Sequence, residues 1–215
     1  MDKQFIVYNF LHFFTLFVAI AAGGISNSKL SIGQKIIFVE LIINLISGIY
    51  SSYRIYNGLY SVPVVSLNEF MCYGIEFFYF DYELNAFRKR RLFRICGVLL
   101  LSIMPLQWMI FGSLNYRGDS QIPISLYLIV LNFYCIICRP VNLSNMILRW
   151  ALLFYNAGTF LLVTYKDYLI WEVDPNIAGK LTTASYRLSD IQLLLITISF
   201  LMANFQKKKM LQLQE

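Results

Sequence analysis

The sequence predicts an all-α membrane protein, a single helical bundle of seven transmembrane helices. Hydrophobic residues make up 58% of the 215 residues and charged residues only 14%, whereas a soluble domain carries roughly 25% charged residues. Long apolar runs also recur throughout the chain. A membrane-spanning helix needs about 20 such residues, so seven helices leave room for short loops but not for a separate soluble domain.

Seven apolar runs place the expected helices at about 5–22, 34–53, 62–82, 95–113, 122–138, 146–165 and 187–206. The first run is longer than the apolar region of a signal peptide and its flank MDKQ is not net positive, so we expect a retained helix. The runs 34–53 and 62–82 are the least apolar, and the count falls to six if either fails to span. Residues 166–186 are expected to form the longest loop, as an interfacial helix or lid, and 207–215 a short basic tail.

The distribution of basic residues predicts the orientation. The first, third and fifth loops with the C-terminus hold 12 of the 18 Lys and Arg residues, and the N-terminus with the other loops holds 6. Basic residues concentrate on the cytoplasmic side, so we expect the N-terminus outside and the C-terminus in the cytoplasm. Because these charges lie in short loops rather than on one patch, the net charge of +6 does not indicate nucleic-acid binding.

Two polar stripes lie within the apolar runs. Glu40 and Asn44 share one helix face, and Glu69, Tyr73 and Glu76 share a face of the next helix. Intramembrane charges are costly, about 2.5–3.5 kcal/mol at a helix centre, so they need partners. The stripes either line a cavity that binds a cation or an amine or relays protons, or pair with Arg54, Arg149 or His12 to hold helices together. The candidate ligand-binding residues are Glu40, Asn44, Glu69, Tyr73, Glu76, Tyr155 and Asn156.

Motifs for catalysis, metals and cofactors are not found in the sequence. The single histidine, His12, is expected to be an interior residue, and the Cys135/Cys138 pair lacks a second ligand pair, so its members are interpreted as small apolar residues. The run 187–206 has no lysine for a retinal Schiff base. We therefore expect no metal, no cofactor and no enzymatic activity.

Two segments carry a resemblance to a known group. LNEFMCYGIEFFYFDYEL (67–84) resembles an N-x-x-x-x-x-E helix, and RWALLFYNAGTFLLVTYKDYL (149–169) resembles a W-x-x-x-x-Y-x-x-G-x-x-x-L helix. Both are similar to small uncharacterised seven-helix membrane proteins of Bacteroidota-type bacteria, some encoded beside sensor histidine kinases, although Glu69 stands where that pattern is often apolar. The resemblance implies a bacterial inner (plasma) membrane location and a sensing role, and no catalytic residue.

The function expected from these features is that of a receptor-like or sensory membrane protein that signals to a cytoplasmic partner. The alternative is a small-solute transporter or channel subunit that uses the intramembrane carboxylates. A receptor needs a pocket that opens outward, here under 166–186, and is closed toward the cytoplasm. The oligomeric state is left open. The residues expected to contact a signalling protein or membrane lipid are Arg88, Lys89, Arg90, Arg91, Lys207, Lys208 and Lys209.

Overall fold

The computed structural model describes residues 3–59, 61–85, 90–111, 121–139, 141–172 and 175–212. Within these ranges the chain forms seven α-helices and one 3-10 turn, so the expected all-α class is confirmed. The elements are α1 (Lys3–Ser26), η1 (Asn27–Lys29), α2 (Ile32–Tyr56), α3 (Val62–Glu83), α4 (Arg90–Phe111), α5 (Gln121–Cys138), α6 (Leu143–Glu172) and α7 (Pro175–Gln212).

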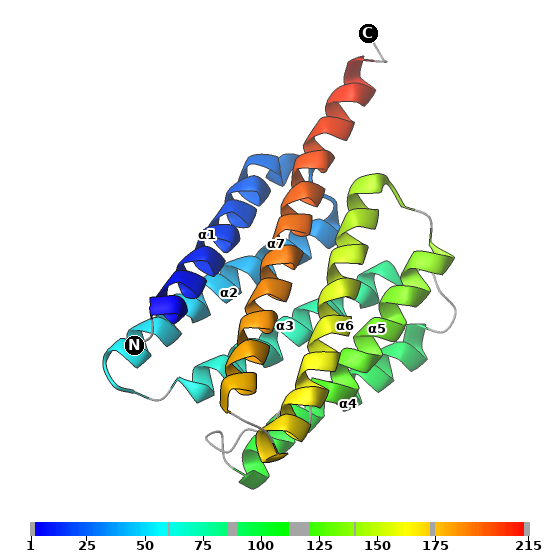
Figure 1. Ribbon diagram of the computed structural model, residues 1–215. Helices are drawn as coiled ribbons and strands as arrows, with labels where there is room; N and C mark the ends of the chain where they lie inside the picture. The colour runs from blue at the N-terminus through cyan, green and yellow to red at the C-terminus, as the bar shows by residue number, and fades with distance from the viewer. Residues whose placement is uncertain are drawn as a thin grey trace.

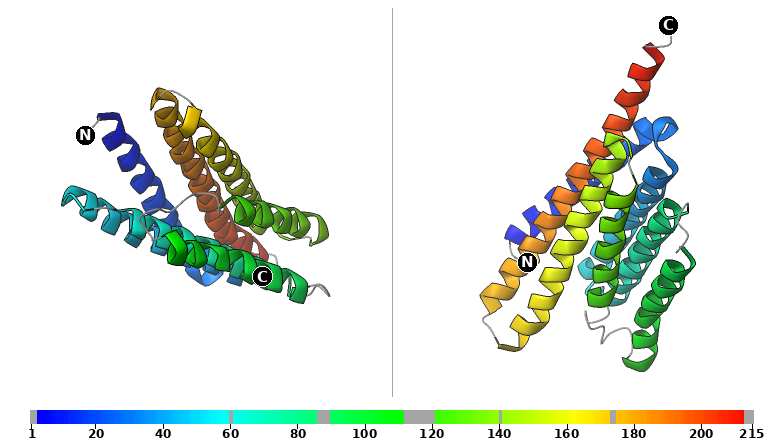
Figure 2. Two further views of the ribbon diagram at one scale, coloured as in Figure 1. Left: turned by 90° about the horizontal axis from the view of Figure 1, so that it is seen from below. Right: turned by 90° about the vertical axis from the view of Figure 1, so that its right-hand side faces the viewer.

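The helices pack in two rows. One row contains α2, α3 and α4, and the other contains α1, α7 and α6, as the view from below in Figure 2 shows. Helix α5 packs against α6, α3 and α4 and closes one edge, while α1 packs on α2 at the other edge. Figure 1 shows α1 beginning near one end of the bundle and α7 ending beyond the other. We call the first of these the pocket end, which is also where α2 passes to α3. We call the second the C-terminal end.

The outer surface of the bundle is apolar. Phe10 on α1, Met109 on α4 and Ile137 on α5 are 72%, 82% and 79% exposed, which a soluble protein of this size avoids over a whole surface. Among the described residues, six helices are long and apolar enough to cross a membrane. Helix α3 is the exception, because its polar residues lower its hydropathy. Its position between α2 and α4 shields part of it from the surroundings.

Local sequence signals set several helix ends. The Ser31 side chain accepts a hydrogen bond from the Gln34 backbone, and the Gln34 side chain accepts one from the Ser31 backbone, which forms a capping box at the start of α2. Gly58 has a φ of +69° in the turn after α2, a conformation that favours glycine. Pro63 lies in the first turn of α3, where its missing N–H leaves no hydrogen bond unmade.

The expected loop at 166–186 is wrong. Helix α6 continues to Glu172 and α7 begins at Pro175, so this stretch is almost entirely helical. The Asp174-Pro175 pair indicated a loop, but proline at the first position of a helix is favourable. Helix α7 also continues to Gln212, so residues 207–212 extend the helix instead of forming a separate tail. Hydropathy detects the part of a helix that is apolar, and helices extend beyond it.

Candidate ligand-binding site

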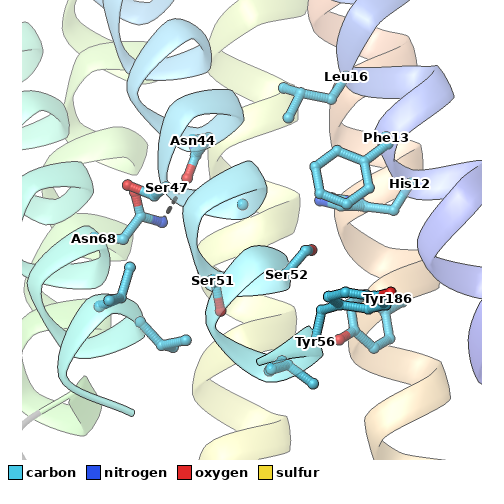
Figure 3. A pocket seen from close by; sticks show the side chains of 14 residues that line it. His12, Phe13, Leu16, Asn44, Ser47, Ser51, Ser52, Tyr56, Asn68 and Tyr186 are labelled. Atoms are coloured by element: carbon cyan, nitrogen blue, oxygen red, sulfur yellow. Dashed lines mark hydrogen bonds between the residues drawn. The ribbon is translucent and has the colours of Figure 1, made fainter. Parts of the chain in front are cut away.

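A pocket of about 620 Å3 lies at the pocket end, between α1, α2, α3 and α7. Small-molecule sites typically have volumes of about 300–1,000 Å3. The lining combines aromatic rings with hydroxyl and amide groups. The lining residues are His12, Phe13, Leu16, Asn44, Ser47, Gly48, Ser51, Ser52, Ile55, Tyr56, Val64, Val65, Asn68 and Tyr186. Figure 3 shows Asn44, Ser47, Ser51 and Asn68 on one side of the pocket and the rings of His12, Phe13 and Tyr186 on the other, with Ser52 between the two groups.

A hydrogen-bonded pair of asparagines forms part of the pocket wall. Asn68 Nδ2 on α3 donates a hydrogen bond of 2.8 Å to Asn44 Oδ1 on α2, drawn as a dashed line in Figure 3. The Cys72 thiol, one turn further along α3, donates to the same oxygen at 3.3 Å. The Asn44 oxygen thus receives two donors and links α2 to α3.

An acidic cluster lies behind the asparagine pair. Glu40 on α2 and Glu76 on α3 are 5% and 2% exposed and lie close enough to interact electrostatically. Asn156 Nδ2 on α6 donates to Glu76 Oε2 at 2.7 Å. The Tyr155 phenol is within electrostatic range of both carboxyls and of Cys72. Three helices therefore place two carboxyls, an amide, a phenol and a thiol together near the middle of the bundle.

A second polar contact joins the pocket wall to α7. His12 Nδ1 lies 3.1 Å from Asp190 Oδ1, and the Thr15 hydroxyl donates to the same oxygen at 3.1 Å. Arg187 Nη1 lies 3.6 Å from Asp190 Oδ2. The His12 ring also packs against Tyr186 at a centroid distance of 5.9 Å. A molecule in the pocket would contact a histidine that is bonded to α7.

The C-terminal end of the bundle is closed by buried contacts. Arg149 on α6 is 1% exposed and forms an ion pair with Glu83 on α3. It also donates hydrogen bonds to the backbone carbonyls of Cys135 and Arg139, each at 2.7 Å. These bonds satisfy carbonyl groups at the C-terminal end of α5, because the last carbonyls of a helix lack partners within it.

The first turn of α6 adds a further contact at the same end. Gln34 Nε2 donates to the Ser144 and Ser199 hydroxyls at 2.8 and 2.9 Å. Buried hydrogen bonds therefore join α2, α6 and α7 at this end of the bundle.

Several expected pairings differ in the structure. One of the two alternatives paired the stripe carboxyls with Arg54, Arg149 or His12, but the partner of Arg149 is Glu83 and that of His12 is Asp190. Glu69 instead accepts a hydrogen bond of 2.6 Å from Gln121 on α5. The acidic partners Glu83 and Asp190 lie at or near the ends of the expected apolar runs 62–82 and 187–206. Charges at such positions are normally exposed, so the sequence gives no signal for their burial.

The other candidate ligand-binding residues are placed in different surroundings. Tyr73 is buried beside the Ser125 hydroxyl on α5, 3.3 Å away, and does not line the pocket. Of the candidates, Asn44 alone lines the pocket, while Glu40, Glu76, Tyr155 and Asn156 form the cluster behind it. The serines of α2 and the His12–Asp190 contact were not among the candidates. Ser47 and Ser51 share the helix face of Glu40 and Asn44, so the spacing of these residues indicates the serines, but it gives no signal for the His12–Asp190 contact.

The residues expected to contact a partner or lipid have mixed outcomes. Arg88 and Lys89 lie outside the described residues, and of Lys207, Lys208 and Lys209 the helical backbone is described but not the side chains. Arg91 is exposed. Arg90 and Arg94 instead both pair with Asp81, at 2.8 and 2.9 Å, so part of the basic run joins α4 to α3.

Comparison with known proteins finds no matching protein-family model, curated protein or solved structure.

Proposed function

We propose that this chain is a receptor-like membrane protein that binds a small molecule in the pocket between α1, α2, α3 and α7. In this proposal all seven helices cross a bacterial inner membrane, with the N-terminus outside and the C-terminus in the cytoplasm. The pocket then opens to the outside. The proposal rests chiefly on one observation, the position of a 620 Å3 polar and aromatic pocket at one end of a bundle whose other end contains the buried Arg149 and Gln34 contacts.

The route for a signal is α7. This helix is continuous from Pro175 to Gln212 and ends beyond the rest of the bundle (Figure 1). It contributes Tyr186 to the pocket and holds His12 through Asp190. A ligand that changes the His12–Asp190 contact would shift α7 relative to α1, and a continuous helix carries such a shift to its far end. A signalling protein or anionic lipid would detect it there.

A small-solute transporter is the second candidate. Glu40 and Glu76 lie behind the pocket and form no ion pair with any described residue, as expected of carboxylates that bind a moving ion. Transporters commonly expose their site through broken helices. The continuity of α7 and of α4, which passes through Pro105 without a break, favours the receptor.

Ligand binding can be tested by thermal unfolding of the full chain in lipid nanodiscs. The probes are tryptamine and tyramine as aromatic amines and nicotinamide as a neutral aromatic amide, because the pocket pairs rings with hydrogen-bonding groups. A probe at 100 times its Kd stabilises by about 2.7 kcal/mol, which raises the unfolding temperature by about 5–10 °C for a chain of this size.

Two tryptophan variants provide the comparison. Ser51→Trp fills the pocket and should abolish the shift, whereas Ile137→Trp places the same side chain on the exposed face of α5 and should retain it. Equal shifts in both variants, or no shift with any probe in the unmodified chain, would contradict the proposed binding site. Accumulation of a binding probe in proteoliposomes would favour the transporter over the receptor.

A further inference from the structure

The Glu40–Glu76 cluster contains two acidic groups and no described counter-charge. Both carboxyls are buried and are electrostatic neighbours. The other titratable groups within electrostatic range of them or of their neighbour Tyr155 are Glu69 and Cys72, and each of these becomes negative when it titrates. Burying one carboxylate carries a penalty of several kcal/mol, and a second like charge adds to it. The negative charge of the cluster is therefore neutralised, either by protonation of the carboxyls or by a bound cation.

Two oxygen atoms of the cluster have no hydrogen-bond partner among the described residues. They are Glu40 Oε2 and Asn156 Oδ1, and both are buried. The orientation of the Asn156 amide is fixed, because its Nδ2 donates both to Glu76 Oε2 at 2.7 Å and to the Leu152 carbonyl at 3.0 Å. Unsatisfied buried acceptors are costly, and only a donor or a cation can satisfy them. Oxygen atoms of carboxylate and amide groups are ligands that hard cations prefer.

We propose that Glu40 and Glu76, with the Asn156 amide oxygen, bind one monovalent cation, either Na+ or a proton, in the middle of the bundle. The route to this site is the pocket, since Asn44 lines it and also accepts the Cys72 hydrogen bond beside the cluster. The inference rests on the proposed function only for this route. The cation site joins α2, α3 and α6, so its occupancy stabilises the bundle whether or not an organic molecule occupies the pocket.

The experiment is thermal unfolding of the full chain in nanodiscs with no organic ligand present. One arm replaces choline chloride by NaCl or KCl at constant ionic strength and mildly alkaline pH. If Na+ is the ligand, the unfolding temperature rises by several degrees in a saturable manner with NaCl and less with KCl. The second arm raises the pH in choline chloride. If a proton is the ligand, the bundle loses stability as the pH rises and NaCl adds nothing.

Neutral variants test the assignment of the site. Glu40→Gln and Glu76→Gln remove the charge that needs compensation, so each should reduce the cation or pH effect by at least severalfold. Asp81→Asn is the matched control, because it neutralises an acidic residue of α3 that pairs with Arg90 and Arg94 and lies outside both the pocket and the cluster, and it should retain the effect. The proposal is overturned if the unmodified chain responds to neither Na+ nor pH, or if both glutamine variants respond as it does. The unmodified chain alone decides the outcome if the variants fail to fold.

Discussion

The buried ion pair between Glu83 and Arg149 provides a quantitative test of how the C-terminal end is closed. Their side chains are 7% and 1% exposed, so neither charge is solvated by water when its partner is removed. Removing one partner of a buried pair destabilises a protein by about 3–5 kcal/mol. Glu83→Gln should fall near the lower limit, because glutamine still accepts a hydrogen bond from Arg149.

Arg149→Met should be the more damaging change. It leaves Glu83 with only the partly exposed Arg139 at 3.5 Å and also removes the donors to the Cys135 and Arg139 carbonyls. Hydrogen bonds from charged groups contribute about 1.5–3 kcal/mol each, which places this variant at or above the upper limit. Because the two residues are in direct contact, the double variant should lose about 0.5–3 kcal/mol less than the sum of the single losses.

The assay is reversible chemical unfolding in mixed micelles, followed by tryptophan fluorescence. Asp81→Asn is the matched control, since it removes a carboxylate whose partners Arg90 and Arg94 are 30% and 51% exposed, and exposed ion pairs contribute about 0–1 kcal/mol. A loss for Glu83→Gln no larger than that of the control, or strictly additive single losses, would refute the interpretation of Glu83–Arg149 as a buried structural pair.

Two further predictions concern packing and orientation. Gly23→Ala should lower the unfolding temperature, because its Cβ would lie 2.4 Å from a ring carbon of Phe38 and overpacking costs about 1–3 kcal/mol. Gly24→Ala has nothing within 4 Å and should leave stability equal or higher by up to about 1 kcal/mol, so equal losses would contradict the observed α1–α2 packing. Reporter fusions should place the N-terminus outside and the C-terminus inside, and termini on one side would exclude seven crossings.

The helices could be predicted because six of them contain an apolar run long enough to cross a membrane, and the run of α3, although interrupted by polar residues, is of similar length. The ends of α6 and α7 could not, since helix formation in water near the membrane surface leaves no hydropathy signal. The burial of Glu40 and Glu76 followed from their spacing and from the penalty for placing charges in lipid. The partners Glu83 and Asp190 were missed, because each lies at or near the end of an expected apolar run and its burial depends on how α3 packs on α6 and α7 on α1. Such contacts depend on the tertiary arrangement, which one chain's periodicity does not encode.

The most direct test of the outward-facing pocket is the accessibility of a single cysteine at Ser51. The substitution Ser51→Cys is made in a chain whose four native cysteines are replaced by alanine, with Ser144→Cys at the C-terminal end as the matched control. A membrane-impermeant maleimide is then applied to right-side-out and to inside-out vesicles. We predict that Ser51→Cys is labelled only from the outside and that Ser144→Cys, whose native residue is buried, is labelled from neither side. Labelling of Ser51→Cys from the cytoplasmic side, or from neither side, would contradict a pocket that opens outward.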